Sequence, residues 1–150
     1  MSAPVLSLTG IVARIEAAGI YRSVGGGRDL RRAAQTGAMG GPLAFVLPME
    51  ETSRPSGVAG GVSHAAVAAR FMVLSLAEDL ARDAGGRAVS RIEEVRASLL
   101  AALAGFKPDF AEGPVTHERG RLVTQPLPGG LIGWQDEFSL RFRRSLIAGG

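Results

Sequence analysis

Apolar residues near the start of the chain recur at the spacing of one helix face. They are Leu8, Ile11, Val12 and Ile15. Pro4 suits the first turn of a helix, where its missing N–H is not needed, and Gly19 suits the position just beyond the C-terminus. The pattern therefore predicts a helix over residues 4–18.

A second helical pattern begins at Ser90. Ser90 and Glu93 have the spacing of a capping box, in which the hydroxyl and the carboxylate bind the free amides of the first turn. The apolar residues that share the inner face are Ile92, Val95, Leu99, Leu100 and Leu103. Gly105 and Pro108 then stop the helix. We expect the helix to start at Ser90 and to pack on the core.

Three segments before this second helix have the pattern of β-strands. Residues 20–24 alternate apolar and polar positions and are followed by glycines. Residues 42–48 are continuously apolar, which predicts a central strand covered on both faces. Residues 62–76 carry apolar side chains on both parities, which favours a long strand, with a helix as the alternative because of the alanines.

The last segment, residues 131–143, gives the clearest strand. Its even positions are apolar at Trp134, Phe138, Leu140 and Phe142, and Asp136 interrupts them. Its odd positions are polar at Gln135, Glu137, Ser139, Arg141 and Arg143. One face is therefore expected to be buried and the other to meet solvent or a polar partner. Trp134 is interpreted as a core anchor, and an interface anchor is the alternative.

The connections are rich in glycine and proline. Glycines 25–27 predict a turn before a short helix at residues 29–35. Residues 50–61 are small, polar and rich in breakers, which predicts a long flexible loop. Residues 114–124 predict a hairpin with its tip at Arg119 and Gly120, and residues 125–130 a further turn.

Composition limits the class of protein. The chain has 150 residues, of which 46% are hydrophobic, and it has no cysteine. This length favours one domain with a packed core, and the absence of cysteine excludes disulfides, thiolate chemistry and Cys-ligated metals. We find no apolar run of the roughly 20 residues that would span a bilayer, and no basic start of a signal peptide, so we expect a soluble protein that is not exported.

The basic residues are almost all arginines. The formal net charge is +3, and 17 residues are Lys or Arg, of which only Lys107 is lysine. The arginines form two clusters, one at Arg28, Arg31 and Arg32 and one at Arg141, Arg143 and Arg144. A solvated face explains such clusters, and contact with a polyanion is the alternative.

The sequence has few residue patterns that indicate catalysis or the binding of a metal or cofactor. His64 and His117 lack the spacing of a zinc site, and the chain has no G-x-S-x-G motif. Glycines 25–27 lie between a predicted strand and a predicted helix, as a phosphate loop would, but they lack the motif that binds phosphate. We therefore expect no catalytic residues, no metal and no cofactor.

The order of the segments resembles that of the tail terminator-like proteins of long-tailed bacteriophages and gene transfer agents. The resemblance spans about the whole chain. The segments that carry the resemblance are YRSVGGGRDL after the first helix, PLAFVLP and the small residues that follow it, VAARFMVLSL, RIEEVRASLLAALAGF and GRLVTQPLPGGLIGWQDEFSLRFR. It implies an α+β fold in one domain, with a mixed, mainly antiparallel sheet and two main helices.

The resemblance also implies a structural role in the virion. Such proteins form six-fold rings at the head-proximal end of the tail tube. They stop tube polymerisation and dock the head–tail connector while DNA passes through the ring. The implied partners are copies of the same chain, the tail tube protein and the connector or stopper protein, with no membrane. The implied location is the neck region of the tail, reached after assembly in the host cytoplasm.

Candidate contact residues follow from this hypothesis. Those of the loop 50–61 and of the polar row in the last strand are Glu50, Arg54, Gln135, Glu137, Arg141 and Arg143. Those expected to face DNA in the lumen are Arg28, Arg31 and Arg32. The alternatives are a head–tail connector or head-closure protein, a small nucleotide-binding domain that uses glycines 25–27, and a DNA-binding module.

Overall fold

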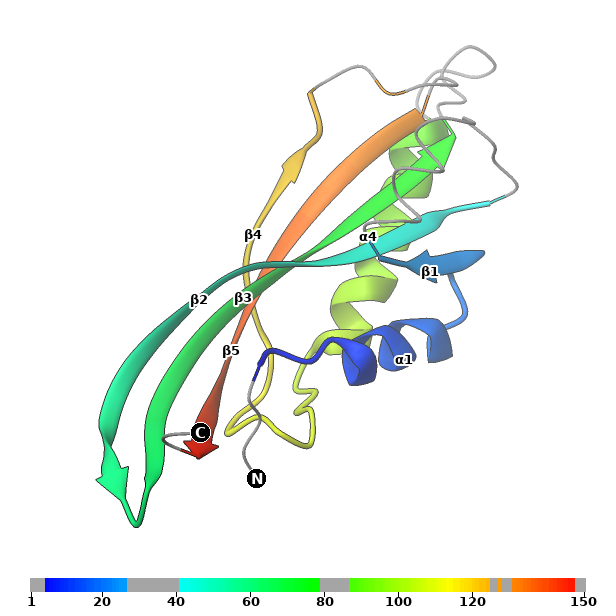
Figure 1. Ribbon diagram of the computed structural model, residues 1–150. Helices are drawn as coiled ribbons and strands as arrows, with labels where there is room; N and C mark the ends of the chain where they lie inside the picture. Colours follow the sequence, from blue (N-terminus) through cyan, green and yellow to red (C-terminus); the bar gives the residue numbers. More distant parts are fainter. Residues whose placement is uncertain (1–4, 27–40, 79–86, 125–126, 128–130, 148–150) are drawn as a thin grey trace.

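Five strands form one mixed sheet in the order β1-β2-β3-β5-β4 (Figure 1). The computed structural model describes residues 5–26, 41–78, 87–124, 127 and 131–147. The strands are β1 (Ser23–Gly25), β2 (Leu43–Ala59), β3 (Val62–Glu78), β4 (Thr116–Leu122) and β5 (Leu131–Ile147). The β1 strand pairs with β2 in parallel, and the other three pairings are antiparallel. The α+β class, with a mainly antiparallel sheet, is thus confirmed.

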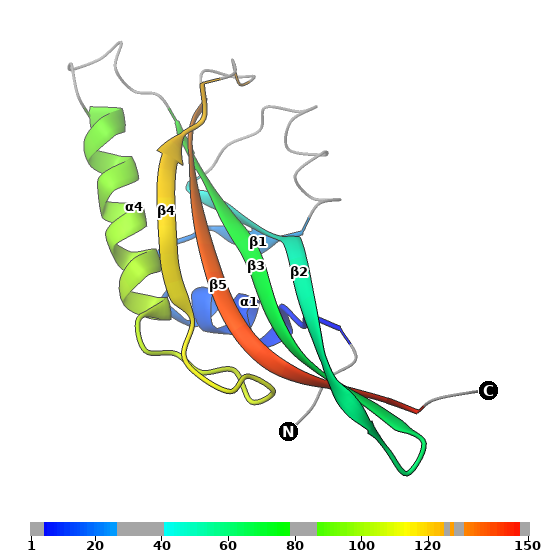
Figure 2. The same ribbon diagram turned by 90° about the vertical axis from the view of Figure 1, so that its left-hand side faces the viewer.

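Two helices cover one face of the sheet, here called the helix face. They are α1 (Thr9–Ala17) and α4 (Arg87–Leu103), and Figure 2 shows both on the same side of the strands. Ile11 and Ile15 of α1, like Leu99 of α4, are fully buried. The helix predicted over residues 4–18 is confirmed over Thr9–Ala17, and the chain turns at Gly19, whose φ is +73°. The predicted start is wrong, because residues 5–8 are not helical. No helix among the described residues is long and apolar enough to span a bilayer.

Aromatic stacking forms the centre of the core on the helix face. The rings of Phe71 on β3 and Phe138 on β5 stack with centroids 5.3 Å apart. Alternation along the strands points these rings towards α1 and α4, while Phe45 and Leu74 point to the opposite face and form a second buried cluster. The predicted strand at 42–48 is therefore covered on both faces near its start, as expected for a central strand.

The predicted loop at residues 50–61 is wrong. Residues up to Ala59 continue β2, and together with β3 they form one long hairpin that turns at Gly60 and Gly61. Both turn glycines have positive φ, +59° and +79°, which matches the twist of a tight hairpin. The prolines fit because the pairing register shifts beside Pro48 and Pro55, and such bulges accommodate residues that cannot donate an N–H.

Residues 62–76 form the long strand that the sequence predicted, not the alternative helix. They pair with β2 on one side and with β5 on the other, so the alanines lie in the middle of the sheet. The last strand is confirmed and extends to Ile147. The predicted strand at 20–24 is shorter and shifted, since β1 covers Ser23–Gly25.

Two boundary predictions are corrected by the structure. The predicted hairpin at 114–124 is one strand, β4, which pairs with β5 along its length, with Gly120 opposite Asp136. The second helix begins at Arg87, so Ser90 lies inside α4 and cannot be its N-cap. The predicted short helix at 29–35 lies outside the described residues, as does most of the turn at 125–130.

Replacing Leu99 by Ala should destabilise the fold by about 2–5 kcal/mol, because the side chain is fully buried between α4 and the sheet. The matched control is Leu100→Ala in the same helix, where the side chain is only partly buried. Chemical unfolding should give a clearly smaller loss for the control. Equal losses would contradict this orientation of α4.

Candidate functional site

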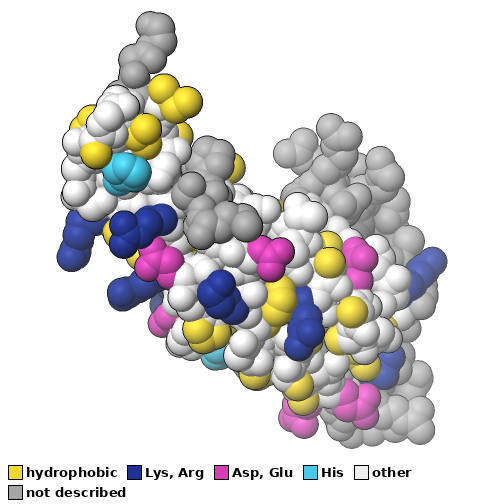
Figure 3. Space-filling model, turned by 90° about the horizontal axis from the view of Figure 1, so that it is seen from below, with side chains coloured by type: hydrophobic (Ala, Val, Ile, Leu, Met, Phe, Trp, Pro, Cys, Tyr) yellow, Lys and Arg dark blue, Asp and Glu magenta, His cyan; other side chains and the backbone are white. Residues whose placement is uncertain are grey.

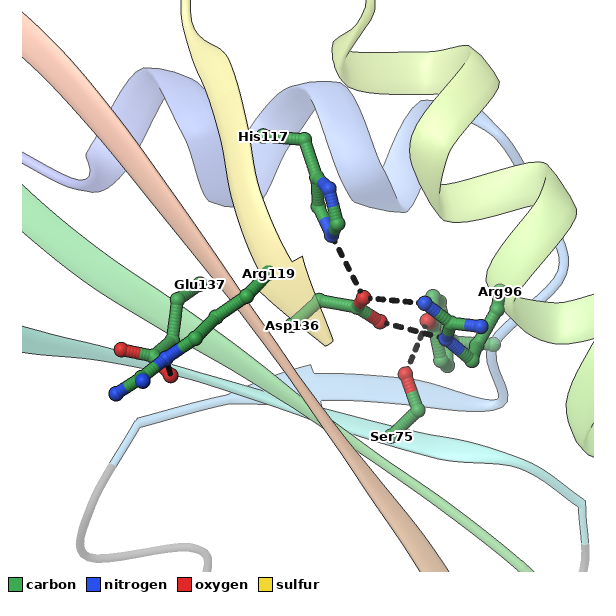
Figure 4. A network of polar contacts seen from close by, with 7 residues as sticks. Ser75, Arg96, His117, Arg119, Asp136 and Glu137 are labelled. Carbon is green, nitrogen blue, oxygen red and sulfur yellow. Dashed lines mark hydrogen bonds and ion pairs between the residues drawn. The ribbon is translucent and has the colours of Figure 1, made fainter. Parts of the chain in front are cut away.

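The middle of β5 buries two consecutive carboxylates on opposite faces of the sheet. Asp136 lies on the helix face and Glu137 on the other, and both are 0% exposed. Their neighbours come from α4, β3 and β4, so this short stretch of β5 contacts most of the fold (Figure 4). Burying a charge is costly unless it is paired, and each carboxylate has two partners.

Asp136 is held by Arg96 and His117. Arg96 of α4 makes a bidentate contact, with Nε donating to Oδ2 at 3.0 Å and Nη2 donating to Oδ1 at 2.7 Å. His117 Nε2 of β4 lies 2.9 Å from Oδ1. These contacts fasten α4 and β4 to β5, because two fixed hydrogen bonds define the position of the guanidinium plane.

Trp134 and Gly120 complete the surroundings of this ion pair. The Arg96 guanidinium lies 4.3 Å from the ring centroid of Trp134, a cation–π contact. Gly120 leaves the space that these groups need, because a Cβ there would lie 2.6 Å from Arg96 Nη2 and from Asp136 Oδ1. The Trp134 Nε1 atom is buried and has no hydrogen-bond partner among the described residues. Trp134 is partly buried and belongs to neither apolar cluster, so it packs on the Arg96–Asp136 ion pair beside the core and is not the core anchor that the sequence predicted.

Tyr21 and Ser75 lie beside this cluster on the helix face. The Tyr21 hydroxyl and Ser75 Oγ are 2.7 Å apart, and Ser75 is fully buried. Burial raises the pKa of Tyr21 well above its usual range, and the nearby charge of Asp136 adds to the shift. Tyr21 thus stays a neutral hydroxyl that ties the segment before β1 to β3.

Glu137 is held by arginines of β3 and β4 on the opposite face. Arg119 Nε donates to Oε2 at 2.5 Å, and Arg70 Nη2 donates to Oε1 at 3.0 Å. Arg70 also donates to Glu50 of β2 at 3.1 Å. The hydrogen bond from Arg119 holds the pKa of Glu137 below its usual range, against the opposing effect of desolvation. This row links four of the five strands of the sheet.

Beyond the helices, the hairpin and the end of β5 project as a three-stranded arm, defined here as residues 52–69 and 141–147 (Figure 1). The side chains at its tip include apolar ones with large exposed fractions: Val58 at 68%, Leu146 at 46% and Ile147 at 88%. Figure 3 shows hydrophobic side chains at this tip and basic ones behind it. The arm carries four arginines and no Asp or Glu; the arginines are Arg54, Arg141, Arg143 and Arg144.

Comparison with known families identifies the chain. The model of a family described as phage tail terminator protein matches residues 1–148. No curated protein matches significantly. The chain belongs to the phage tail terminator family. It is therefore a structural protein of the phage tail, from a family of virion proteins that are not enzymes, and it associates with other tail components.

The contact residues predicted for this tail terminator fall in different environments. Arg54, Arg141 and Glu50 are exposed on the face opposite the helices, and Arg143 there contacts Glu112 at 3.3 Å. Gln135 is partly buried. Glu137 meets polar partners, as expected for this face, but they are arginines of the same chain, and its buried carboxylate is not exposed for the contact with another chain that was predicted. The predicted lumen residues Arg28, Arg31 and Arg32 lie outside the described residues.

Sequence reasoning missed the polar cluster around β5. The only signal was Asp136, a charged residue on an otherwise apolar face. Its partner Arg96 is 40 residues away and His117 is 19 away, and no motif connects them. Among the described residues, no group of three potential metal ligands occurs. Neither carboxylate has a serine among its hydrogen-bond partners there, so the cluster resembles an ion-pair network more than a hydrolase triad.

Replacing Gly120 by Ala should destabilise the terminator by about 1–3 kcal/mol, because the new methyl group would overlap the Arg96–Asp136 ion pair and Trp134. Gly113→Ala is the matched control, since its Cβ would meet no atom within 4 Å. Thermal unfolding of both variants at neutral pH measures the difference. A Gly120 variant as stable as the control would mean that the ion pair can move aside.

Replacing Glu137 by Gln should lower the melting temperature at pH 7 and should make the melting temperature change less when the pH is lowered. The folded-state pKa of Glu137 is lowered, so its stabilising effect is full above the unfolded value of about 4.3 and is lost as the pH falls through the folded value. The gap between wild type and variant should therefore close on acidification below about pH 4.3. Glu93→Gln, at an exposed position of α4, is the control and should show no such gap. A gap that persists at low pH would contradict the ionic role.

Proposed function

We propose that the protein forms a six-membered ring at the head-proximal end of the tail tube. In this proposal the ring stops polymerisation of the tube protein, docks the head–tail connector in the neck of the particle and lets DNA pass through its lumen. The observation that carries the proposal is the family match over residues 1–148. The ring would form in the host cytoplasm, during tail assembly.

The shape of the protomer supports contacts with further chains. The arm extends past α1 and α4, so much of its surface is not covered by the rest of the described chain (Figure 2). Its exposed arginines Arg54, Arg141 and Arg143, together with Glu50 at its base, are the side chains we assign to contacts with neighbouring protomers or tail proteins. Gln135 belongs to the same assignment. We assign Arg28, Arg31 and Arg32 to the lumen.

Deletion of the gene should give tails of irregular and excessive length, because nothing would stop tube growth. Complementation with wild type should restore uniform tails, as should complementation with Arg91→Ala, a change at an exposed helix position away from the arm. Tail lengths in negatively stained lysates are the measurement. Tails of normal length that lack heads would instead indicate the connector or head-closure role.

A further inference from the structure

Exposed large apolar side chains gather at two separate places on the protomer. Of the six such residues in the described chain, three lie at the arm tip and two lie near the start of the hairpin; the sixth is Leu122 on β4. Monomeric surfaces rarely keep clustered apolar side chains in water without a partner. The two places are therefore candidates for contacts between chains.

The arm tip presents apolar side chains on both faces of its sheet. Val58 and Leu146 flank Ser63 in one cross-strand row, so they share the helix face, beyond the reach of the helices. Ile147 follows on β5, 88% exposed and paired to Val62. The tip thus forms a small apolar knob across the end of the arm, with side chains from both of its outer strands, β2 and β5.

The second place is an open depression of about 540 Å³ on the β2 side of the sheet. It is lined by Val5, Leu6, Pro48, Met49, Glu50 and Glu51. The Leu6 amide donates to Glu51 Oε1 at 2.8 Å, which fixes the segment before α1 against β2. The depression therefore has a fixed wall, and its lining exposes two apolar side chains, Val5 at 63% and Met49 at 38%.

The charges of the two places are complementary. The arm carries no carboxylate, and its Arg54 and Arg141 have no ion-pair partner among the described residues, whereas Glu50 and Glu51 border the depression. Glu51 is already paired with Arg144 of the same protomer, so Glu50 is the carboxylate available to a neighbouring copy. Glu50 keeps 57% of its side chain exposed although it contacts Arg70. Opposite charges around an apolar contact favour the correct partner and disfavour contact between two tips or two depressions.

The two places are separate patches of one chain, because the knob is formed by β2 and β5 at the end of the arm, whereas the depression is formed by residues 48–51 of β2 and the segment before α1. A contact between different patches of two identical chains is head-to-tail, and its repetition closes into a ring when the rotation allows it. We propose that the arm tip of one protomer, with Val58, Leu146 and Ile147, docks into the Val5–Met49 depression of the next copy. This inference rests on the proposed ring and names the contact that builds it.

A mixing experiment tests the head-to-tail arrangement. Ile147→Asp should disable the knob and Met49→Asp the depression, so each variant alone should be monomeric where the wild type forms rings. An equimolar mixture keeps one intact knob and one intact depression per pair, so it should give heterodimers and nothing larger. Leu122→Asp, at an exposed apolar position away from both places, is the control and should still form rings. Light scattering after size exclusion measures the masses, and circular dichroism confirms folding.

Two results would overturn the contact. One is rings formed by either single variant, and the other is a mixture that stays monomeric although both variants are folded and the wild type forms rings. If the wild type is monomeric in solution, crosslinking on tail tubes decides instead. The chain has no cysteine, so oxidised Met49→Cys/Ile147→Cys protein should give a ladder of covalent oligomers, which neither single cysteine variant can give.

Tail tubes treated with the double cysteine protein also show whether the contact or the proposed function has failed. Tubes capped by the double cysteine protein without a ladder would overturn the contact and leave termination standing. Tubes that grow unchecked in the presence of the wild-type protein, together with normal tail lengths after gene deletion, would overturn termination itself.

Discussion

The pairing of two buried carboxylates in β5 is the constraint on which the rest of the fold depends. Asp136 and Glu137 are consecutive, so the alternation of a strand sends one to each face of the sheet. Each can stay ionised only with cationic or hydrogen-bonding partners, and these come from α4, β3 and β4. Breaking such a buried pair by removing one partner commonly costs about 3–5 kcal/mol. The position of β4 is thereby fixed, although all its side chains are exposed.

Gly120 shows how this constraint acts on the backbone. In the sequence it has the look of a turn residue, because it follows Arg119 between two polar segments. In the structure it sits inside β4, where only a residue without a side chain leaves room for Arg96, Asp136 and Trp134. The local preference of glycine for turns therefore predicted a hairpin at Gly120. The structure has a strand there, because the ion pair packed against Gly120 needs the space that a side chain would fill.

The core was predictable from the sequence, and the ion pairs and the arm were not. Periodicity identified the apolar faces at Ile11, Ile15 and Leu99, because a helix face that packs on a core needs apolar residues at every third or fourth position. The pairing of Asp136 with Arg96 depends on tertiary approach and leaves no local pattern. The strand at 52–59 was missed because its side chains are all exposed, so nothing in its composition distinguishes it from a loop. Its structure comes from the backbone pairing with β3, which composition does not encode.

The free edge of the arm explains why its composition is so unlike that of a strand. Among the described residues β1 covers β2 only at its start, so the rest of β2 has an edge there that could pair with another strand. Prolines, bulges and a charged residue are the means by which proteins block such pairing, and β2 has Pro48, Pro55 and Arg54 in this stretch. Because backbone pairing is discouraged, side chains are the groups that the arm leaves available to another chain, and its exposed large apolar ones lie at its tip. A side-chain contact between two different patches closes into a ring when the rotation between copies allows it, whereas backbone pairing at an open strand edge can add further strands repeatedly.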